Sequence, residues 1–371
     1  MLNEGWISYA GPSITQADVD AVLDAARNGF YENYRENVTK LEELVCSILN
    51  VEFALATNSA TSALHLALAA SGVGSGDEVI TTNVSCVASA MPILHCDAVP
   101  VLVDVDVETW CVSPLAIERA ITDRTKAILP VHWNGHPCDM REILRIARKY
   151  ELIVVEDAAA AFGAKSQGAA VGALGDVGCF SFQGAKIAIG GQGGVLVTND
   201  RELYERARVL ASYGRTDSHG TYWSDYVGWN YGMANLPAAL ATSQLSRLGE
   251  LLAYKQMIFT AYKSQLAAIE GVRIVDSSAG DQSTYCYPTI EVLPEAGLSR
   301  DQFLDALRRS RIDARPTQPQ ISQMPMFESR YETPNARAAA DKGIILPSAF
   351  RLSEEDVHQV ASRIGEILKG K

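Results

Sequence analysis

Short, almost continuously apolar runs alternate with longer amphipathic stretches through the first half of the chain. Such a run is typical of a strand buried on both faces of a sheet, and the stretches between carry apolar residues at helical spacing. The alternation therefore predicts an α/β fold in which helices cover both faces of a mostly parallel sheet. The expected strands are 53–57, 78–82, 100–104, 127–131, 152–155, 180–182 and 194–198, and the expected helices are 15–29, 36–49, 61–70, 88–94 and 140–150.

The second half of the chain predicts a separate unit. The expected elements there are the helices 201–212, 236–272, 299–310 and 353–369 and the strands 285–292 and 312–315. The helix at 236–272 is long enough to connect two domains, and the elements after it form an α+β unit. We therefore expect a large domain over residues 1–245 and a smaller C-terminal domain over residues 246–371.

The composition excludes several classes of partner. Of the 371 residues, 47% are apolar and 20% are charged, which is an ordinary balance for a globular protein. The formal net charge of −12 argues against sequence-independent binding to nucleic acid, because such binding needs a basic surface. No apolar run approaches the roughly 18 residues of a membrane span, so no membrane segment is expected.

The cysteines, histidines and N-terminus predict a cytoplasmic protein without a metal site. The N-terminus lacks the basic and apolar regions of a signal peptide. The seven cysteines are scattered and odd in number, which favours reduced thiols over a disulfide framework. Gly135 and Pro137 interrupt the closest histidine pair, His132 and His136, so these side chains are not expected to bind a metal on one helix face.

One lysine stands alone among small and apolar residues. Lys186 follows the predicted strand 180–182 and precedes a glycine cluster at 190–194. Burial disfavours the charged form of a lysine, and the neutral amine can form a Schiff base with a carbonyl. Upstream, the run 152–155 leads into Asp157, and an aspartate at a strand end is the usual partner for the pyridinium nitrogen of pyridoxal phosphate (PLP). Lys186 and Asp157 together predict a PLP enzyme.

The turn after the first predicted strand is a candidate phosphate site. Ser59, Ala60 and Thr61 lie between a strand and a helix, and ligands bind at the carboxyl ends of parallel strands. The same hydroxyl groups are typical helix caps, and both functions can hold at once. Ser181, on the predicted strand 180–182, is a second candidate phosphate ligand, although a serine in the core would fit its pattern equally well.

Blocks of sequence from about residue 8 to residue 368 keep the order and spacing of a known family. The blocks are TSALHLAL at 61–68, GDEVI at 76–80, PVH at 130–132, VEDAA at 155–159, FSF at 180–182 with Lys186, GWNY at 228–231 and LP at 346–347. In them the chain resembles the DegT/DnrJ/EryC1/StrS sugar aminotransferases. The resemblance implies the PLP-dependent aminotransferase fold type I, similar to aspartate aminotransferase, and a homodimer whose active sites are shared between subunits.

The resemblance also implies roles for individual residues. Lys186 would form the Schiff base and move the proton during amine transfer, and Asp157 would keep the pyridine nitrogen protonated. Ser181 and the backbone at 60–61 would hold the cofactor phosphate. Asn230 would reach that phosphate from the neighbouring subunit.

Four positions depart from the family pattern. Cys86 stands where an aromatic residue usually stacks on the cofactor ring, and Ala160 replaces a glutamine or glutamate near the phenolic oxygen of the cofactor. Gly232 replaces an arginine, and Gln192 replaces the glutamate of the glycine turn. Losing a stacked ring costs on the order of 1 kcal/mol, which a covalently held cofactor tolerates. Losing an arginine matters more if it contacts the carboxylate of the amino donor.

The resemblance implies a substrate class as well. The chain is expected to convert a keto group of a nucleotide-linked deoxysugar, such as GDP-4-keto-6-deoxymannose, to an amine with L-glutamate as donor. Loops near 30–36, 215–230 and 315–330 would contact the nucleotide. The candidate substrate contacts are Tyr31, Tyr34, Arg35 and Arg315, although aromatic residues in loops more often pack locally.

Three other functions stay open. The substrate could be a non-nucleotide keto sugar or keto-cyclitol, which the residues Cys86, Ala160 and Gly232 keep under consideration. A PLP-dependent sugar dehydratase is a second alternative, but in the known 3-dehydratase branch a histidine replaces the lysine, so Lys186 argues against it. A non-catalytic relative that binds PLP or a sugar is the third, and an intact Lys186–Asp157 pair would be superfluous there.

Overall fold

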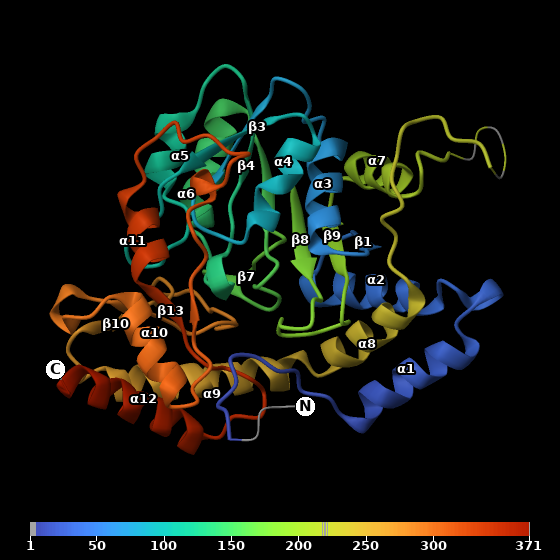
Figure 1. Cartoon of the computed structure of the whole chain (residues 1–371). Coiled ribbons are helices and arrows are strands. Elements are labelled where there is room, and N and C mark those ends of the chain that lie inside the picture. The colour runs from blue at the N-terminus through green and yellow to red at the C-terminus, as the bar shows by residue number, and fades with distance from the viewer. Residues whose placement is uncertain (1–4, 217, 219, 221, 371) are drawn as a thin grey trace.

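A seven-stranded sheet forms the centre of the computed structural model, which describes residues 5–216, 218, 220 and 222–370 (Figure 1). Its strands are β1 (Phe53–Thr57), β2 (Glu78–Thr82), β3 (Val99–Val103), β4 (Thr125–Leu129), β5 (Ile153–Asp157), β8 (Val177–Ser181) and β9 (Gly194–Thr198). The strand order is β1-β9-β8-β5-β4-β2-β3. Strand β9 runs antiparallel to β1 and β8, and the other neighbouring pairs are parallel. The expected mostly parallel sheet, with a hairpin across the glycine cluster, is confirmed.

Helices cover both faces of this sheet (Figure 1). They are α1 (Gln16–Asn28), α2 (Glu36–Leu49), α3 (Ala60–Ala70), α4 (Met91–His95), α5 (Pro114–Ala120), α6 (Met140–Tyr150), α7 (Arg201–Ala211) and α8 (Asn235–Ser246). Helices α3, α4 and α7 pack on one face, and α2, α5, α6 and α8 pack on the other. In β9, Leu196 faces α3 while Val195 and Val197 face α2 and α8. Burying each such side chain contributes about 1.5–3 kcal/mol.

A smaller C-terminal domain follows α8, as expected. Its helices are α9 (Leu248–Leu266), α10 (Arg300–Arg309), α11 (Pro334–Lys342) and α12 (Glu354–Lys369), and its strands are β10 (Val272–Ile274), β11 (Thr289–Val292), β12 (Arg315–Pro316) and β13 (Gly343–Ile345). The strands form an antiparallel sheet in the order β10-β11-β13-β12, on which α9, α10 and α12 pack. Helix α11 joins the core beside α5 and α6 instead. The division between residues 245 and 246 stays a prediction.

Short elements complete the connections. They are the strand pair β6 (Lys165–Ser166) and β7 (Ala169–Ala170) and the 3-10 helices η1 (Tyr31–Asn33), η2 (Val87–Ser89), η3 (Trp133–Gly135), η4 (Pro294–Ala296) and η5 (Ile321–Gln323). The helix expected at 88–94 is thus divided between η2 and α4.

The single helix expected over 236–272 is wrong, because the chain forms two helices there. Arg247 leaves the helical conformation at φ −118° and ψ 27°, and its guanidinium donates to Ser13 and Asp18 beside the start of α1. Helix α9 ends at Leu266, and the chain turns through residues 267–271 before β10. Gly271 has a φ of +92°, but it lies beyond the helix cap Ala267, so it belongs to the turn into β10 and not to the helix end.

The expected C-terminal strands are longer than the observed ones. Tyr285 has a φ of +48° and Pro288 has no N–H to donate, so the strand expected over 285–292 is confined to β11. The strand expected over 312–315 is replaced by the two-residue β12. The unexpected elements are α5, α11, β6, β7, β10, β13, η1, η3, η4 and η5, which are short and carry little periodicity.

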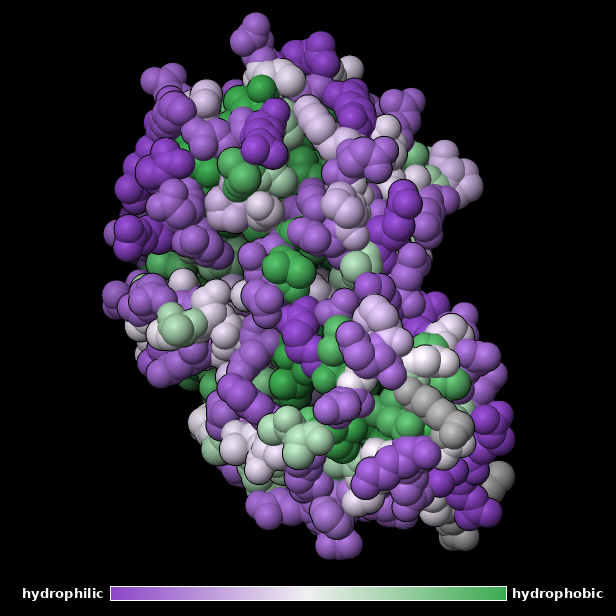
Figure 2. All heavy atoms as spheres, turned by 90° about the vertical axis from the view of Figure 1, so that its left-hand side faces the viewer, coloured by the Kyte–Doolittle hydropathy of each residue, from purple (hydrophilic) through white to green (hydrophobic). Residues whose placement is uncertain are grey.

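The surface is polar over most of the face shown in Figure 2, where hydrophobic residues appear in smaller patches. Among the described residues, no helix combines the length and the apolar character that crossing a membrane requires.

Gly194, the first residue of β9, allows this strand to touch the first turn of α3. It pairs with Thr57 of β1 on one side and with Ser181 of β8 on the other. A Cβ atom on Gly194 would lie 2.5 Å from the Ala60 nitrogen and 2.6 Å from the Ser59 carbonyl carbon. Both atoms are backbone, so a side chain at 194 would have to move the start of α3.

A buried carboxylate at the start of β2 joins two distant segments. The Glu78 side chain is 0% exposed and accepts hydrogen bonds at 2.6 Å from Thr122, Arg124 and Arg330. Burial by itself raises the pKa of Glu78, but these three donors outweigh it and hold the pKa at about 2.

We predict that Gly194→Ala lowers the free energy of unfolding by about 2 kcal/mol, because overpacking against the α3 backbone forces a shift. Urea denaturation measures this. The matched control is Gly184→Ala, since a Cβ on Gly184 would lie 3.9 Å from its nearest neighbour. Equal stabilities of the two variants would contradict the assigned close contact.

We predict that Glu78→Gln lowers the free energy of unfolding by about 2 kcal/mol at pH 7, because hydrogen bonds to a charged group are lost. The folded pKa of about 2 lies below the ordinary 4.5. The stabilisation is therefore present above pH 4.5 and is lost as the pH falls toward 2. Denaturant titrations from pH 7 to pH 3 should show the gap between wild type and variant narrowing.

The control for Glu78→Gln is Glu36→Gln, which removes an exposed i,i+4 ion pair with Lys40. That variant should stay within about 0.5 kcal/mol of wild type. A pH-independent gap for Glu78→Gln would show that the carboxylate charge has no part in the effect.

Candidate active site

A cavity of about 680 Å³ opens at the carboxyl ends of β1, β5 and β8. This edge is where open α/β sheets bind ligands, and the volume suits a cofactor or another small molecule. Of the predicted site residues, those that line the cavity are Ser59, Ala60, Thr61, Cys86, Asp157, Ser181 and Lys186. Ala160 lines a narrower extension of about 60 Å³, which shares Cys86, Asp157 and Lys186 with the main cavity.

The first turn of α3 forms one end of the cavity. The Ser59 hydroxyl accepts a hydrogen bond from the Ser62 N–H at 3.1 Å, so Ser59 caps the helix as its sequence context suggested. The N–H groups at Ala60 and Thr61 have no partner within the helix, as at every helix N-terminus. Together with the helix dipole, these groups can hold a phosphate. Capping and anion binding are compatible here.

Asp157 ends β5 and is 4% exposed. Its backbone continues the parallel pairing, because its N–H donates to Pro130 and its carbonyl accepts from His132. One carboxylate oxygen, Oδ1, accepts a hydrogen bond from the Ala159 N–H at 3.0 Å. The side chain is thus fixed at the cavity, where it can stabilise a positive charge on a bound ring.

The preceding residue, Glu156, is fully buried and holds a neighbouring loop. It accepts hydrogen bonds from the N–H groups of Gly172, Leu174 and Gly175 at 2.7–2.8 Å and from His132 at 3.0 Å. Burial raises the pKa of Glu156, but the bonds from His132 and the backbone outweigh it and leave the pKa below its ordinary value. This network orders the backbone beside Asp157.

Lys186 follows β8 in a tight turn closed by Gln183. The Gln183 carbonyl accepts from the Lys186 N–H at 2.9 Å, and its side-chain oxygen accepts from the Ala185 N–H at 2.8 Å. The Lys186 Nζ lies 5.4 Å from the centre of the Tyr287 ring. Lys186 and Asp157 therefore border one cavity, and their roles toward a cofactor stay predictions.

The predicted contacts from the α1–α2 connection lie outside this cavity. Tyr31 and Tyr34 are 93% and 62% exposed, and Arg35 forms an ion pair with Glu42 at 3.4 Å. In the predicted loop 215–230, positions 217, 219 and 221 lie outside the described residues. Among their described residues, neither segment lines the cavity at Lys186.

Asn230 and Arg315 also lie outside the lining of the cavity. The Asn230 side chain is exposed, and its carbonyl accepts a hydrogen bond from Asn58 at 3.2 Å. Arg315 pairs with Asp313 at 2.8 Å, and its guanidinium lies 5.9 Å from the ring centre of Tyr9. Arg315 is therefore in contact with the cavity wall, not with the cavity itself.

The cavity residues that the sequence analysis did not single out include Tyr9, Tyr287 and Gln318. Tyr9 precedes the first helix. Tyr287 falls within the strand expected over 285–292, but the chain is irregular there, so the pattern did not indicate that its side chain borders the cavity. Burial raises the pKa of both tyrosines above its ordinary value. Among the described residues, the Gln318 Oε1 is buried without a hydrogen-bond partner, which suits a donor group on a ligand.

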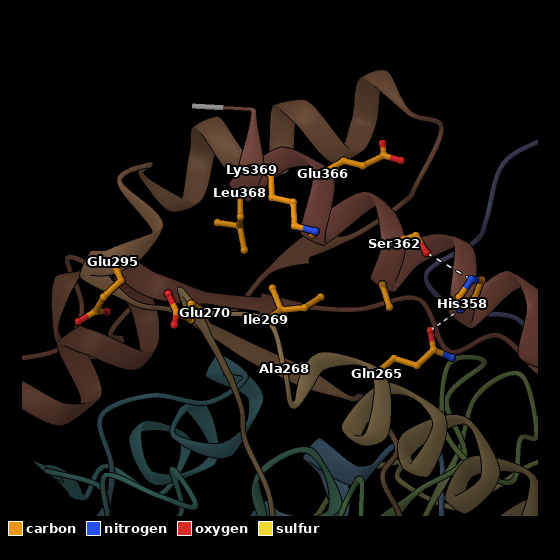
Figure 3. A pocket seen from close by; sticks show the side chains of 12 residues that line it. Gln265, Ala268, Ile269, Glu270, Glu295, His358, Ser362, Glu366, Leu368 and Lys369 are labelled. Atoms are coloured by element: carbon orange, nitrogen blue, oxygen red, sulfur yellow. Dashed lines mark hydrogen bonds between the residues drawn. The ribbon is translucent and has the colours of Figure 1, made fainter.

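A second hollow of about 790 Å³ lies between the end of α9 and α12 (Figure 3). It shares no residue with the cavity at Lys186. Its histidine, His358, is in hydrogen-bonding contact with Gln265 at 3.0 Å and with Ser362 at 3.5 Å (Figure 3). No lysine–aspartate pair or helix N-terminus faces this hollow, so it is not the candidate active site.

Several proteins resemble this chain over 80–99% of its length. It is 35% identical to a GDP-perosamine synthase of Escherichia coli O157:H7, covering 99% of this chain and 100% of that protein. It is 36% identical to a GDP-perosamine synthase of Caulobacter vibrioides, covering 98% of both. A putative L-glutamine:3-amino-2,3-dideoxy-scyllo-inosose aminotransferase of Streptoalloteichus tenebrarius is 35% identical over 80% of this chain and 73% of that protein.

Solved structures share the fold. The structure of 3-amino-5-hydroxybenzoic acid synthase matches with a TM-score of 0.91 at 28% identity, covering 99% of this chain and 100% of the other. The PLP form of a putative sugar aminotransferase, Spr1654 from Streptococcus pneumoniae, matches with a TM-score of 0.91 at 25% identity, covering 98% and 99%. The model of the DegT/DnrJ/EryC1/StrS aminotransferase family matches residues 12–365. The chain therefore belongs to the DegT/DnrJ/EryC1/StrS aminotransferase family.

Proposed function

We propose that this chain is a PLP-dependent aminotransferase that converts a keto group of a nucleotide-linked deoxysugar to an amine, with L-glutamate as the amino donor. The observation that carries the proposal is the single cavity bordered by Lys186, Asp157 and the first turn of α3. A lysine amine can bond to the aldehyde of the cofactor, an aspartate can pair with its ring nitrogen, and a helix N-terminus can bind its phosphate.

The residues of the cavity fit PLP. The turn at 59–61 offers helix N–H groups to a phosphate, and the Ser181 hydroxyl borders the same space. Gly193 and Gly194 bring the backbone of the glycine cluster close to this turn, and the unpartnered Gln318 Oε1 leaves an acceptor for a ligand. When bound, the cofactor supplies a carbonyl for the amine and a ring that accepts electrons.

Each of these residues would have a separate role in the reaction. The Lys186 Nζ would form the bond to the aldehyde of the cofactor and would take and return the proton that amine transfer requires. The Asp157 carboxylate would stabilise the positive charge of a protonated ring nitrogen. The first turn of α3 would hold the phosphate and so orient the cofactor between Lys186 and Asp157. Cys86 and Ala160 line the same space, and neither side chain has an aromatic ring that could stack on the cofactor.

The proposed substrate class is inferred from the names of the similar proteins. Two GDP-perosamine synthases match essentially the full chain at 35–36% identity, which favours a sugar carried on GDP, such as GDP-4-keto-6-deoxymannose. The cavity residues other than Lys186 and Asp157 are uncharged, so cations for the nucleotide phosphates would come from Arg35, Arg315 or a second subunit.

We also propose a homodimer in which Asn230 of one subunit reaches the cofactor phosphate of the other. Asn230 is exposed, and its segment is anchored to Asn58 beside the cavity. The preceding loop exposes Tyr222, Tyr226 and Val227 by 62–88%. An exposed apolar group of this kind is typical of a contact surface.

A keto-cyclitol substrate is the second candidate. The resemblance to a putative scyllo-inosose aminotransferase favours it, at an identity equal to that of the perosamine synthases but over less of the chain. Cys86, Ala160 and Gly232 depart from the family pattern near the cofactor and the donor. A Cβ on Gly232 would meet nothing within 4 Å, so the missing arginine leaves open space.

We predict that the protein purified with PLP absorbs visible light through a Schiff base at Lys186, and that Lys186→Ala abolishes this band and lowers turnover by at least about 100-fold. Asp157→Asn should keep the band but lower turnover by a similar factor. Borohydride reduction followed by mass spectrometry identifies the modified lysine. The control is Lys165→Ala, an exposed lysine outside the cavity. A wild-type protein with no band at Lys186 would reject the proposal.

We predict at least a tenfold higher kcat/KM for GDP-4-keto-6-deoxymannose than for a keto-cyclitol, with L-glutamate as donor. Mass spectrometry of the amine product from a panel of keto sugars and keto-cyclitols measures the preference, with L-glutamine as a second donor. Preference for the keto-cyclitol would establish the second candidate instead.

A further inference from the structure

Tyr287 contacts Lys186 in two ways, and neither the family assignment nor the proposed reaction gives it a role. The face of its ring lies 5.4 Å from the Lys186 Nζ. Its hydroxyl donates a 2.9 Å hydrogen bond to the carbonyl of Ala185, the residue immediately before the lysine. One side chain therefore touches both the amine and the backbone that carries it.

Tyr287 is itself held rigidly. Its ring stacks on that of Tyr9, with the ring centres 5.6 Å apart and the planes 7° from parallel. The Tyr9 carbonyl accepts a hydrogen bond from the Ser348 N–H at 2.9 Å. Tyr287 is 8% exposed, so its ring has little freedom to turn away from the lysine.

A buried lysine anchors the segments behind both rings. Lys255 is 4% exposed, and its ammonium donates to the Ser348 carbonyl, to the Ser348 hydroxyl at 3.1 Å and to the Cys286 carbonyl at 3.4 Å. Burial lowers the pKa of Lys255 to about 8. Lys255 thus links the segment that precedes Tyr287 to the segment that holds Tyr9.

We propose that Tyr287 is a positioning residue for Lys186: its ring face holds the protonated amine at the cavity, and its hydroxyl fixes the backbone turn from which the amine projects. The proposal rests on the proposed function in that Lys186 is the reactive amine. Attraction between a cation and a ring face favours the charged amine and restricts its position. The lysine therefore stays at the cavity while it is not bonded to a cofactor.

A tyrosine that only packs in the core would affect stability without affecting the amine. The two roles can be separated because the hydroxyl and the ring make different contacts. Tyr287→Phe removes the bond to Ala185 and keeps the ring, whereas Tyr287→Leu removes both. Tyr285→Phe and Tyr285→Leu are matched controls, since Tyr285 stacks on Phe259 and does not line the cavity.

The first experiment follows Lys186 in the protein stripped of cofactor. A pulse of an amine-reactive reagent, read by mass spectrometry, gives the labelling rate of Lys186 relative to surface lysines of the same sample. Tyr287→Leu should raise this rate about threefold at neutral pH, because the amine loses the ring face that attracts it. The other ionisable groups of the cavity and beside the amine, Tyr9, Cys86, Asp157 and Cys286, are kept in every variant.

Hydrogen exchange in the same stripped protein tests the hydroxyl contact. Tyr287→Phe keeps the ring and should leave the labelling rate of Lys186 unchanged, but it should speed exchange in the turn 183–187 severalfold, because Ala185 loses its anchor. This experiment does not depend on Tyr287→Leu and remains a valid test if that variant fails to fold. Wild-type exchange in Tyr287→Phe, or equal effects from the Tyr285 controls, would overturn the proposal.

The final experiment uses the protein loaded with PLP. In Tyr287→Leu, the single-turnover reaction with L-glutamate should slow several-fold. If the stripped protein shows both effects but no variant, wild type included, forms the band, then the positioning role holds and the proposed function fails. If the band forms and neither the labelling rate nor the exchange changes, the positioning role fails alone.

Discussion

The architecture of the cavity depends on the backbone contact between β9 and the first turn of α3 at Gly194. Because β9 lies antiparallel between β1 and β8, those two strands run in the same direction and end at one edge of the sheet. The turn at Ser59 and the strand end at Ser181 therefore border the same space, and the parallel neighbour β5 brings Asp157 to it. The glycine cluster that follows Lys186 is thus a structural requirement, since it turns the chain into the strand that aligns the others.

The sheet and most of the cavity could be predicted because local sequence determines them. Buried strands are continuous apolar runs, and the residues that follow them must meet at one edge, so Ser59, Asp157 and Lys186 follow from pattern and order. The place of Tyr9 and Tyr287 in the cavity wall could not be predicted, since the two residues are far apart in the sequence and meet only where the N-terminal segment packs against the C-terminal domain. The break at Arg247 also depends on distant partners, because its guanidinium binds the segment before α1.

The lining of the cavity carries few charges. Among its described residues, Lys186 and Asp157 carry the only formal charges, and the remaining polar groups are hydroxyls, amides and the Cys86 thiol. The backbone N–H groups at the start of α3 can hold one phosphate, and the neutral side chains can orient an uncharged part of a ligand through hydrogen bonds. Further anionic groups on a ligand would need cations from outside the cavity.

The pairing of Tyr9 with Tyr287 has a consequence for the biogenesis of the protein. Tyr9 lies near the N-terminus and Tyr287 in the C-terminal domain, yet their stacked rings form one wall of the cavity. A ribosome-bound chain that has completed the central sheet still lacks that wall, because the second tyrosine emerges only with the C-terminal domain. The cavity is accordingly completed late in synthesis, and truncated or stalled translation products lack one of its walls.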